Sequence, residues 1–244
     1  RDEWASAVVV GQMQRRQLEE ALADWMGTPA AILCSSGFQA NLSMLQSLAG
    51  ADDLLLSDSL NHASLIDGCR MSKAKRLIYK HNDMTDLRAK LEEAKGSRRI
   101  FIVTDGVFSM EGSIVDLPGV VKLAREYDAT IILDDCHGVG VMGENGRGTA
   151  EHCGLEGDVD IITGTLGKAA FRGGGAYASI FSANELYAPR MRAALPRLKR
   201  LMAAQSSRHR RKSVAYTLGG IDSGFTKKKK RRGIQVDSGG CSLL

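Results

Sequence analysis

The chain has few aromatic residues and few prolines for its length. Aromatic residues make up 5% of its 244 residues, and 4 residues are prolines. A core must therefore be built from Leu, Ile, Val, Ala and Met, and the 43% hydrophobic content suffices for one large or two modest domains. No apolar run approaches the roughly 18 residues of a membrane span, and no signal-peptide pattern opens the chain, so we expect no membrane association.

Cysteines are also few, and their spacing excludes two classes of small protein. The five cysteines are scattered without a C-x-x-C pair, at Cys34, Cys69, Cys136, Cys153 and Cys241. An odd, scattered set argues against a disulfide framework and against a structural zinc site. We therefore expect no bound metal and a reducing, cytoplasmic compartment.

Acidic residues are nearly missing from one end of the chain, although the net charge is only +5. Residues 190–232 contain 15 of the 33 Lys and Arg but a single acid, Asp222, which leaves a net charge of −9 on the remainder. We expect a basic helix over residues 186–204 and a disordered basic tail over residues 205–244. The run Lys227–Arg232 could contact nucleic acid or anionic lipid through charge alone, but such runs are more often only solvated, so we expect no nucleic-acid partner.

Short apolar runs alternate with longer helical segments through the first two thirds of the chain. The predicted strands are Ala30–Leu33, Asp53–Ser57, Arg76–Tyr79, Ile100–Val103, Thr130–Leu133 and Val159–Ile162, and the predicted helices end near Met26, Ala49, Met71, Ala94 and Tyr127. This alternation predicts βαβ units in an α/β domain, three layers deep, around a mostly parallel sheet. Past Tyr177 the pattern degrades, so we assign residues 1–185 to this domain.

Ionisable side chains follow two of the predicted strands. Asp134 and His137 come after one strand, and Lys168 lies in a loop of small residues after another. An acid, a histidine and a lysine just past strand ends are what a pyridoxal phosphate (PLP) site requires, because the lysine holds the cofactor as a Schiff base and the acid pairs with the protonated ring nitrogen. From these residues alone, a surface acid and a surface lysine in ordinary loops remain the alternative.

A turn rich in Ser and Gly over residues 34–41 leads from the first strand into a helix. The free backbone N–H groups at such a helix start form a cradle for an anion or a phosphate group. The same serines are also common helix caps, so the turn by itself does not decide between the two roles.

Five blocks of sequence carry a resemblance to a known family. They are NHASLIDG (residues 61–68), TDGVFSMEG (104–112), DDCHGVG (134–140), GENGRG (143–148) and GTLGKA (164–169). In this order they resemble the α-oxoamine synthases, PLP-dependent enzymes of fold type I that join an amino acid to an acyl-CoA. The resemblance spans roughly residues 15–180, and it is greatest to the glycine C-acetyltransferase branch, with the 8-amino-7-oxononanoate synthases close behind.

The resemblance implies a catalytic role for four residues. Lys168 would hold the cofactor and remove the Cα proton of the substrate as a general base. Asp134 would pair with the ring nitrogen of PLP, and His137 would hydrogen-bond its phenolic oxygen. His62 would stack on the ring, although a histidine at a helix start could also be only a cap.

The resemblance also implies how the rest of the cofactor is bound. Ser36, Gly37 and Phe38 would form the phosphate turn, with backbone N–H groups from the last two, and Thr165 would add its hydroxyl. Ser109 would line the site. Of the two residues that follow Asp134, we expect Asp135 to be structural and assign Cys136 no chemistry.

The implied reaction condenses glycine with acetyl-CoA to 2-amino-3-oxobutyrate and CoA in a homodimer, as in threonine and glycine metabolism. A first alternative condenses alanine with a pimeloyl thioester, as in biotin synthesis. A second is a truncated, non-catalytic fragment whose basic tail binds polyanions.

Three departures from the family pattern stand out. Residues after about 205 resemble nothing in the family, as the basic, aperiodic end of a fragment would. Family members have an N-terminal segment and a C-terminal small domain, with an arginine for the substrate carboxylate, that we do not find here. After Lys168, the residues Gly174, Gly175 and Tyr177 keep part of a glycine-rich family loop, but Phe171 and Arg172 add bulk to it.

Overall fold

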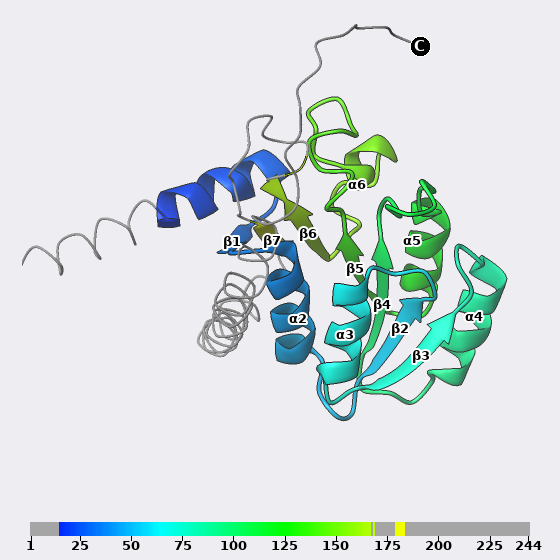
Figure 1. The fold of residues 1–244 in the computed structure, drawn as a ribbon. Helices are drawn as coiled ribbons and strands as arrows, with labels where there is room; N and C mark the ends of the chain where they lie inside the picture. The colour runs from blue at the N-terminus through cyan, green and yellow to red at the C-terminus, as the bar shows by residue number, and fades with distance from the viewer. Residues whose placement is uncertain (1–14, 167, 169–178, 184–244) are drawn as a thin grey trace, which may run out of the picture. The chain divides into compact units, whose positions relative to one another are not determined.

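The computed structural model describes residues 15–166, Lys168 and residues 179–183 (Figure 1). All of them lie in the first of two compact units, Arg1–Met202, and the second unit lies outside the described residues. The predicted helix over 186–204 and the predicted tail over 205–244 also lie outside them, so the domain assignment stays a prediction. In the part that the structure describes, no helix is long and apolar enough to cross a membrane.

Within this part, seven strands form a single sheet in the order β1-β7-β6-β5-β4-β2-β3. The strands are β1 (Ala30–Cys34), β2 (Leu54–Asp58), β3 (Lys75–Tyr79), β4 (Ile100–Asp105), β5 (Thr130–Asp134), β6 (Ile161–Thr165) and β7 (Ser179–Ala183). Neighbouring strands are parallel except around β7, which is antiparallel to both β1 and β6. The predicted mostly parallel sheet is therefore confirmed.

Two details of the sheet differ from the prediction. The strand β7 is not predicted, because five residues with no clear alternation do not stand out until β1 and β6 pair with them on both sides. The strand β6 begins at Ile161 instead of Val159 and extends to Thr165, since Gly164 and Thr165 still pair with β7. Thr165 therefore lies at a strand end and not in the loop that follows.

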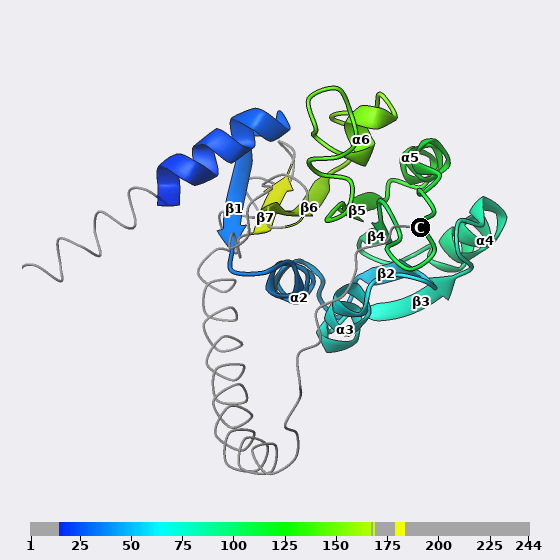
Figure 2. The ribbon, with the colours of Figure 1, turned by 45° about the horizontal axis from the view of Figure 1, so that its top comes forward.

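Helices cover both faces of the sheet, which confirms the three-layer α/β/α architecture (Figures 1 and 2). One helix spans residues 15–26, and the others are α2 (Gly37–Leu48), α3 (Ala63–Met71), α4 (Met84–Glu93), α5 (Leu117–Glu126) and the short α6 (Thr149–His152). Figure 2 shows α2 and α3 on one side of the sheet and α4 and α5 on the other. This is the arrangement that right-handed βαβ crossovers produce.

The strands are buried on both faces, so their side chains divide between two hydrophobic clusters. On β4, Ile102 packs into the cluster that contains Leu87 of α4 and Val120 of α5. The neighbouring Phe101 packs into the opposite cluster with Met44 of α2. Continuous apolar runs, in place of an alternation with polar residues, are the pattern of strands covered on both sides.

Four helices begin at polar residues that cap them. The side chains of Ser36, His62, Asp83 and Asp116 each accept a backbone N–H from the first turn of α2, α3, α4 and α5. Because these helices follow the parallel strands, their N-termini lie at the edge of the sheet where those strands end. Polar caps, helix N-termini and strand ends therefore meet at one edge.

Candidate active site

A cavity of about 270 Å³ opens at this edge. It is lined by Gly37, Phe38, Asn41, His62, Ser64, Asp105, Val107, Ser109, Asp134, Cys136, His137, Thr165 and Lys168. The structure thus brings together every predicted site residue except Ser36. The hydroxyl of Ser36 instead accepts the backbone N–H of Gln39 at 3.2 Å as the cap of α2.

Asp134 is the best-supported carboxylate of the cavity. It is only 4% exposed, and it accepts a hydrogen bond from Asn41 Nδ2 and one from the backbone N–H of Cys136 at 3.1 Å. Asn41 is itself fully buried, donates to Ser64 Oγ and accepts from Thr163 Oγ1, both at 2.9 Å. Donors that favour the ionised carboxylate suit it to a cationic partner.

Asn41 is a residue that sequence reasoning missed. The only signal in the sequence is a polar residue on the face of α2 that also carries Leu45 and Leu48, which are buried. A buried amide needs partners, but the pattern does not reveal that one of them is a carboxylate 93 positions away.

Lys168 and His137 meet across the cavity. Lys168 Nζ lies 2.8 Å from His137 Nε2, although the two residues follow different strands. Burial and the nearby charge of Lys168 lower the pKa of His137 below its usual value. The lowered pKa favours the neutral imidazole, which can share a hydrogen bond with Lys168 Nζ and offer its other ring nitrogen to a ligand.

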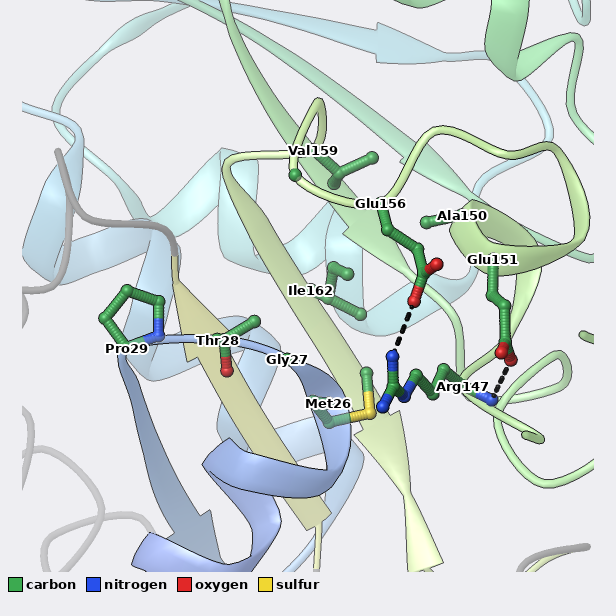
Figure 3. Close-up of a pocket in the computed structure, with 11 residues that line it drawn as sticks. Met26, Gly27, Thr28, Pro29, Arg147, Ala150, Glu151, Glu156, Val159 and Ile162 are labelled. Atoms are coloured by element: carbon green, nitrogen blue, oxygen red, sulfur yellow. Dashed lines mark hydrogen bonds and ion pairs between the residues drawn. The ribbon is translucent and has the colours of Figure 1, made fainter.

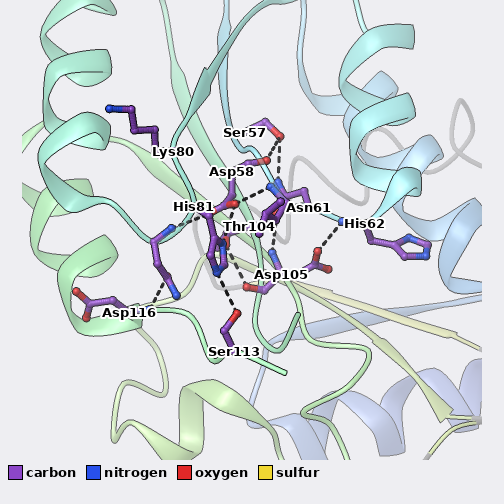
Figure 4. Close-up of polar contacts among 12 residues, drawn as sticks. Ser57, Asp58, Asn61, His62, Lys80, His81, Thr104, Asp105, Ser113 and Asp116 are labelled. Carbon is purple, nitrogen blue, oxygen red and sulfur yellow. Dashed lines mark hydrogen bonds and ion pairs between the residues drawn. The ribbon is translucent and has the colours of Figure 1, made fainter. Parts of the chain in front are cut away.

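His62 is both a helix cap and a wall of the cavity. Its Nδ1 accepts the backbone N–H of Ser64 at 3.2 Å and lies 2.7 Å from Ser64 Oγ. Its own backbone N–H donates to Asp105 at 2.6 Å (Figure 4). The cap is therefore observed, and the predicted stacking of His62 on the ring of PLP stays a prediction.

Asp105 adds a second carboxylate, which sequence reasoning also missed. It pairs in register with Asp134 on the neighbouring strand, and both line the cavity. Burial and then the charge of Asp134 raise the pKa of Asp105 to about 8. Asp105 belongs to the TDGVFSMEG block, which the sequence singles out, but the sequence does not reveal that Asp105 lies beside Asp134.

The phosphate end of the predicted site lies at the start of α2. Gly37 and Phe38 line the cavity there, and the first N–H groups of a helix have no intrahelical partner. Thr165 Oγ1 lies 2.8 Å from Cys136 Sγ. Burial, and next the charge of Asp134, raise the pKa of the Cys136 thiol well above its usual value, so the thiol stays protonated.

Asp135 turns away from the cavity and holds the neighbouring loop. Its carboxylate accepts the backbone N–H and the hydroxyl of Thr149, each at 2.6 Å, at the start of α6. A Cβ on Gly106, Gly138 or Gly148 would come within 2.4 Å of this carboxylate. These three positions therefore require glycine, and Asp135 serves the fold.

A second cavity, of about 570 Å³, lies among residues 26–29, α6 and the start of β6 (Figure 3). Its charged groups pair with one another, because Arg147 Nη1 donates to Glu156 at 2.9 Å and the Arg147 backbone N–H donates to Glu151 at 2.8 Å. It contains no predicted site residue. Among residues 15–166 and Lys168, no three His, Cys, Asp or Glu side chains group as a metal site.

Comparison with known proteins places this chain in a known enzyme family. The model of the family described as aminotransferase class I and II matches residues 8–235, further at both ends than the resemblance over 15–180. The chain is 53% identical to 2-amino-3-ketobutyrate coenzyme A ligase of Escherichia coli strain K12 over 168 residues, which are 68% of this chain and 42% of that enzyme. It is 50% identical to 8-amino-7-oxononanoate synthase of Fervidobacterium nodosum over 178 residues, 69% of this chain and 45% of that enzyme.

Solved structures of related enzymes share the fold. A serine palmitoyltransferase from S. paucimobilis, with a bound PLP–myriocin aldimine, superposes with a TM-score of 0.67 at 31% identity, over 84% of this chain and 55% of that one. An 8-amino-7-oxononanoate synthase from Francisella tularensis gives a TM-score of 0.60 at 32% identity, over 80% of this chain and 61% of that one. The chain thus spans less than half the length of the two curated relatives described above.

Proposed function

The chain belongs to the aminotransferase class I and II family, and from this premise we propose that it is a PLP-dependent acyltransferase of the α-oxoamine synthase type. The proposed reaction condenses glycine with acetyl-CoA to 2-amino-3-oxobutyrate and CoA. The observation that carries the proposal is the meeting of Lys168, His137 and Asp134 in one cavity at the N-terminus of α2.

The residues of the cavity fit PLP. A buried carboxylate, Asp134, suits a protonated ring nitrogen, and the first N–H groups of α2 at Gly37 and Phe38 suit a phosphate group. The exposed amine of Lys168 reaches into the same space. When bound, PLP supplies an electron sink for the carbanion that forms at the amino acid Cα.

The side chains then divide the work of binding and proton transfer. Lys168 Nζ is the base for the Cα proton of the amino acid, and neutral His137, 2.8 Å away, can share that proton. Asp134, oriented by the hydrogen bonds from Asn41 and the Cys136 backbone, would pair with the ring nitrogen of PLP. His62 lines the cavity from the start of α3, where it would lie against the ring of PLP.

An alternative substrate pair has nearly equal support. The relative from Fervidobacterium nodosum is an 8-amino-7-oxononanoate synthase at 50% identity, against 53% for the E. coli ligase. A difference of three percentage points in sequence identity does not decide between the two substrate pairs, glycine with acetyl-CoA and alanine with a pimeloyl thioester. The second alternative, a non-catalytic fragment with a polyanion-binding tail, is distinguished by the activity test below.

A homodimer in the cytoplasm completes the proposal. Met110 is 89% exposed and Val141 is 63% exposed, on the loops that follow β4 and β5 beside the cavity. Large apolar side chains at such a place suit an interface between two copies of the chain. The four cysteines in the described part are free thiols, as suits a reducing compartment.

The cofactor test is PLP titration of the purified chain, followed by visible absorbance. We expect a band that disappears in Lys168→Ala and persists in Lys122→Ala, a matched control on the exposed face of α5. A wild-type chain without a lysine-dependent band would rule out the cofactor assignment.

The substrate test measures release of free thiol from acetyl-CoA with glycine and from pimeloyl-CoA with alanine. The faster pair identifies the reaction. A chain that binds PLP through Lys168 but releases no thiol from either pair is a cofactor-binding fragment or uses another acyl group.

A further inference from the structure

A short hairpin carries one wall of the cavity. Val107 and Ile114 form an antiparallel bridge, and the Phe108 N–H donates to the Ser113 carbonyl at 2.9 Å. Val107 and Ser109, on the first leg and at the tip, line the cavity. Ser113 and Ile114 lie on the second leg. The position of Ser109 therefore depends on what holds that second leg.

The turn after β3 holds the second leg of the hairpin through the side chains of His81 and Asn82. His81 Nε2 lies 3.0 Å from Ser113 Oγ, and Asn82 Nδ2 donates to the Ile114 carbonyl at 3.0 Å (Figure 4). Asn82 Oδ1 also accepts the backbone N–H of Asp116 at 3.0 Å, just before α5. Two hydrogen bonds from two adjacent residues thus hold the second leg, and a third holds the start of α5 beside it.

The turn is anchored in its own right by a buried carboxylate. Asp58, at the end of β2, binds His81 Nδ1 at 3.1 Å and accepts the backbone N–H groups of Asn82 at 3.0 Å and Leu60 at 2.9 Å. Asn82 has a φ of 52°, a left-handed conformation that a residue other than glycine adopts at a cost of about 1 kcal/mol. The bonds to Asp58 and to the hairpin outweigh this strain.

We propose that His81 is a positioning residue for the cofactor cavity, linking the buried Asp58 to the hairpin that presents Ser109. The edge of the Phe108 ring packs against His81 with centroids 4.4 Å apart, so the imidazole is fixed from the hairpin side as well. The inference rests on the proposed function, because it assigns to the hairpin a role in holding PLP.

The order Asp58–His81–Ser113 is also that of a hydrolytic triad. The hydrogen bonds around these residues favour a role in positioning the hairpin over a role in hydrolysis. Both Asp58 oxygens are shared with backbone N–H groups, and the neighbouring Asn82 makes parallel bonds to the same leg without any nucleophile. Several hydrogen bonds that join the turn after β3 to the hairpin restrain the hairpin, and His81 contacts both Asp58 and Ser113.

Two conservative variants test separately the contact of His81 Nδ1 with Asp58 and the contact of His81 Nε2 with Ser113. In His81→Asn an amide stands near the place of Nδ1 and keeps the bond to Asp58, whereas in His81→Gln it reaches the place of Nε2 and keeps the bond to Ser113. We expect the Kd for PLP to rise about five- to tenfold in His81→Asn and in Ser113→Ala, the effect of one lost hydrogen bond, and to change little in His81→Gln. Lys80→Ala, whose side chain points away from these contacts in Figure 4, is the control.

A double-mutant cycle tests whether the effect passes through Ser109. In a Ser109→Ala background, His81→Asn should add less than about twofold to the Kd, because the presented group is already gone. Additive losses would overturn the inference, since they would mean that His81 acts on the cavity by another route.

Hydrogen exchange of the chain without cofactor gives a readout that does not depend on PLP. His81→Asn and Ser113→Ala should speed exchange at the hairpin amides of Phe108 and Val115 and leave β4 unchanged, and Lys80→Ala should alter neither. Unchanged hairpin exchange overturns the positioning role even where PLP binds. Faster hairpin exchange in the two variants, together with a wild-type chain that gains no PLP band, would instead count against the proposed function alone.

Discussion

Asp105 and Asp134 end neighbouring strands, and their side chains have different partners. Asp134 receives hydrogen bonds from the amide of Asn41 and the backbone of Cys136. Asp105 receives one from His62, and burial and the charge of Asp134 raise its pKa to about 8. Burial and the charge of Asp134 therefore favour the protonated form of Asp105, which can donate a hydrogen bond.

The raised pKa of Asp105 predicts how stability depends on pH. The folded chain keeps a proton on Asp105 that the unfolded chain loses near pH 4, so unfolding becomes easier as pH rises from about 4 to about 8. Asp105→Asn removes this term, and the loss of up to about 1.4 kcal/mol per pH unit should be smaller in the variant. Urea unfolding of both proteins without cofactor, at about pH 6 and about pH 8, measures it. Parallel pH profiles would contradict the assignment.

Asn41 predicts a coupled loss of stability and of cofactor binding. Asn41→Ala removes one buried hydrogen bond from Thr163 and one from Asp134, so we expect a cost of about 2 kcal/mol in the free energy of unfolding and weaker PLP binding. Gln46→Ala on the same helix, whose side chain binds only the Leu42 carbonyl in the described contacts, should alter neither quantity. Urea unfolding and PLP titration check both. Normal PLP affinity in Asn41→Ala would show that Asp134 does not need this support.

At the scale of elements, apolar runs and turn residues were enough to predict six of the strands and the three layers. Each of these strands is a self-contained local signal, as in Ile100–Val103. The strand β7 was not predictable because it is defined by its neighbours β1 and β6. The same limit applies to the site: strand ends pointed to Asp134 and Lys168, but the contacts of Asn41 and His81 join segments far apart in sequence.

The opposite edge of the sheet is held by an ion cluster. Asp53, before β2, is 1% exposed and binds the guanidinium groups of Arg98 and Arg99, which precede β4. Burial would raise the pKa of Asp53, but the hydrogen bonds from Arg99 and Arg98 outweigh it and hold the pKa well below its usual range. The cluster therefore fixes the starts of two adjacent strands.

This cluster predicts an acid-sensitive contribution to stability. Asp53→Asn should cost about 3 kcal/mol at neutral pH, the lower end for a broken buried pair, because Arg98 is 55% exposed and stays solvated. A lowered pKa gives stability above the unfolded value of about 4 that disappears as pH falls below it, so the difference between wild type and variant should shrink there. Urea unfolding across pH measures this, with Asp52→Asn, the exposed neighbour, as the control. A pH-independent difference would contradict it.

At the scale of the described molecule, two exposed apolar residues, Met110 and Val141, lie on the loops that also line the cavity. The loops after β4 and β5 carry Ser109 and His137 into the cavity and, within a few residues, expose Met110 and Val141. If a second copy of the chain covers these residues, it also closes the cavity to solvent. Self-association and cofactor binding should then strengthen each other.

We therefore expect Met110→Glu and Val141→Glu to weaken both self-association and PLP binding. Each places a charge in the proposed interface, so the dimer should dissociate at least about tenfold more readily. Light scattering should give twice the 26.3 kDa of one chain for the wild type and a lower mass for the variants at equal concentration. Met71→Glu, at an exposed apolar position at the end of α3, should leave the mass unchanged. A monomeric wild-type chain that binds PLP with full affinity would show that the cavity needs no second copy.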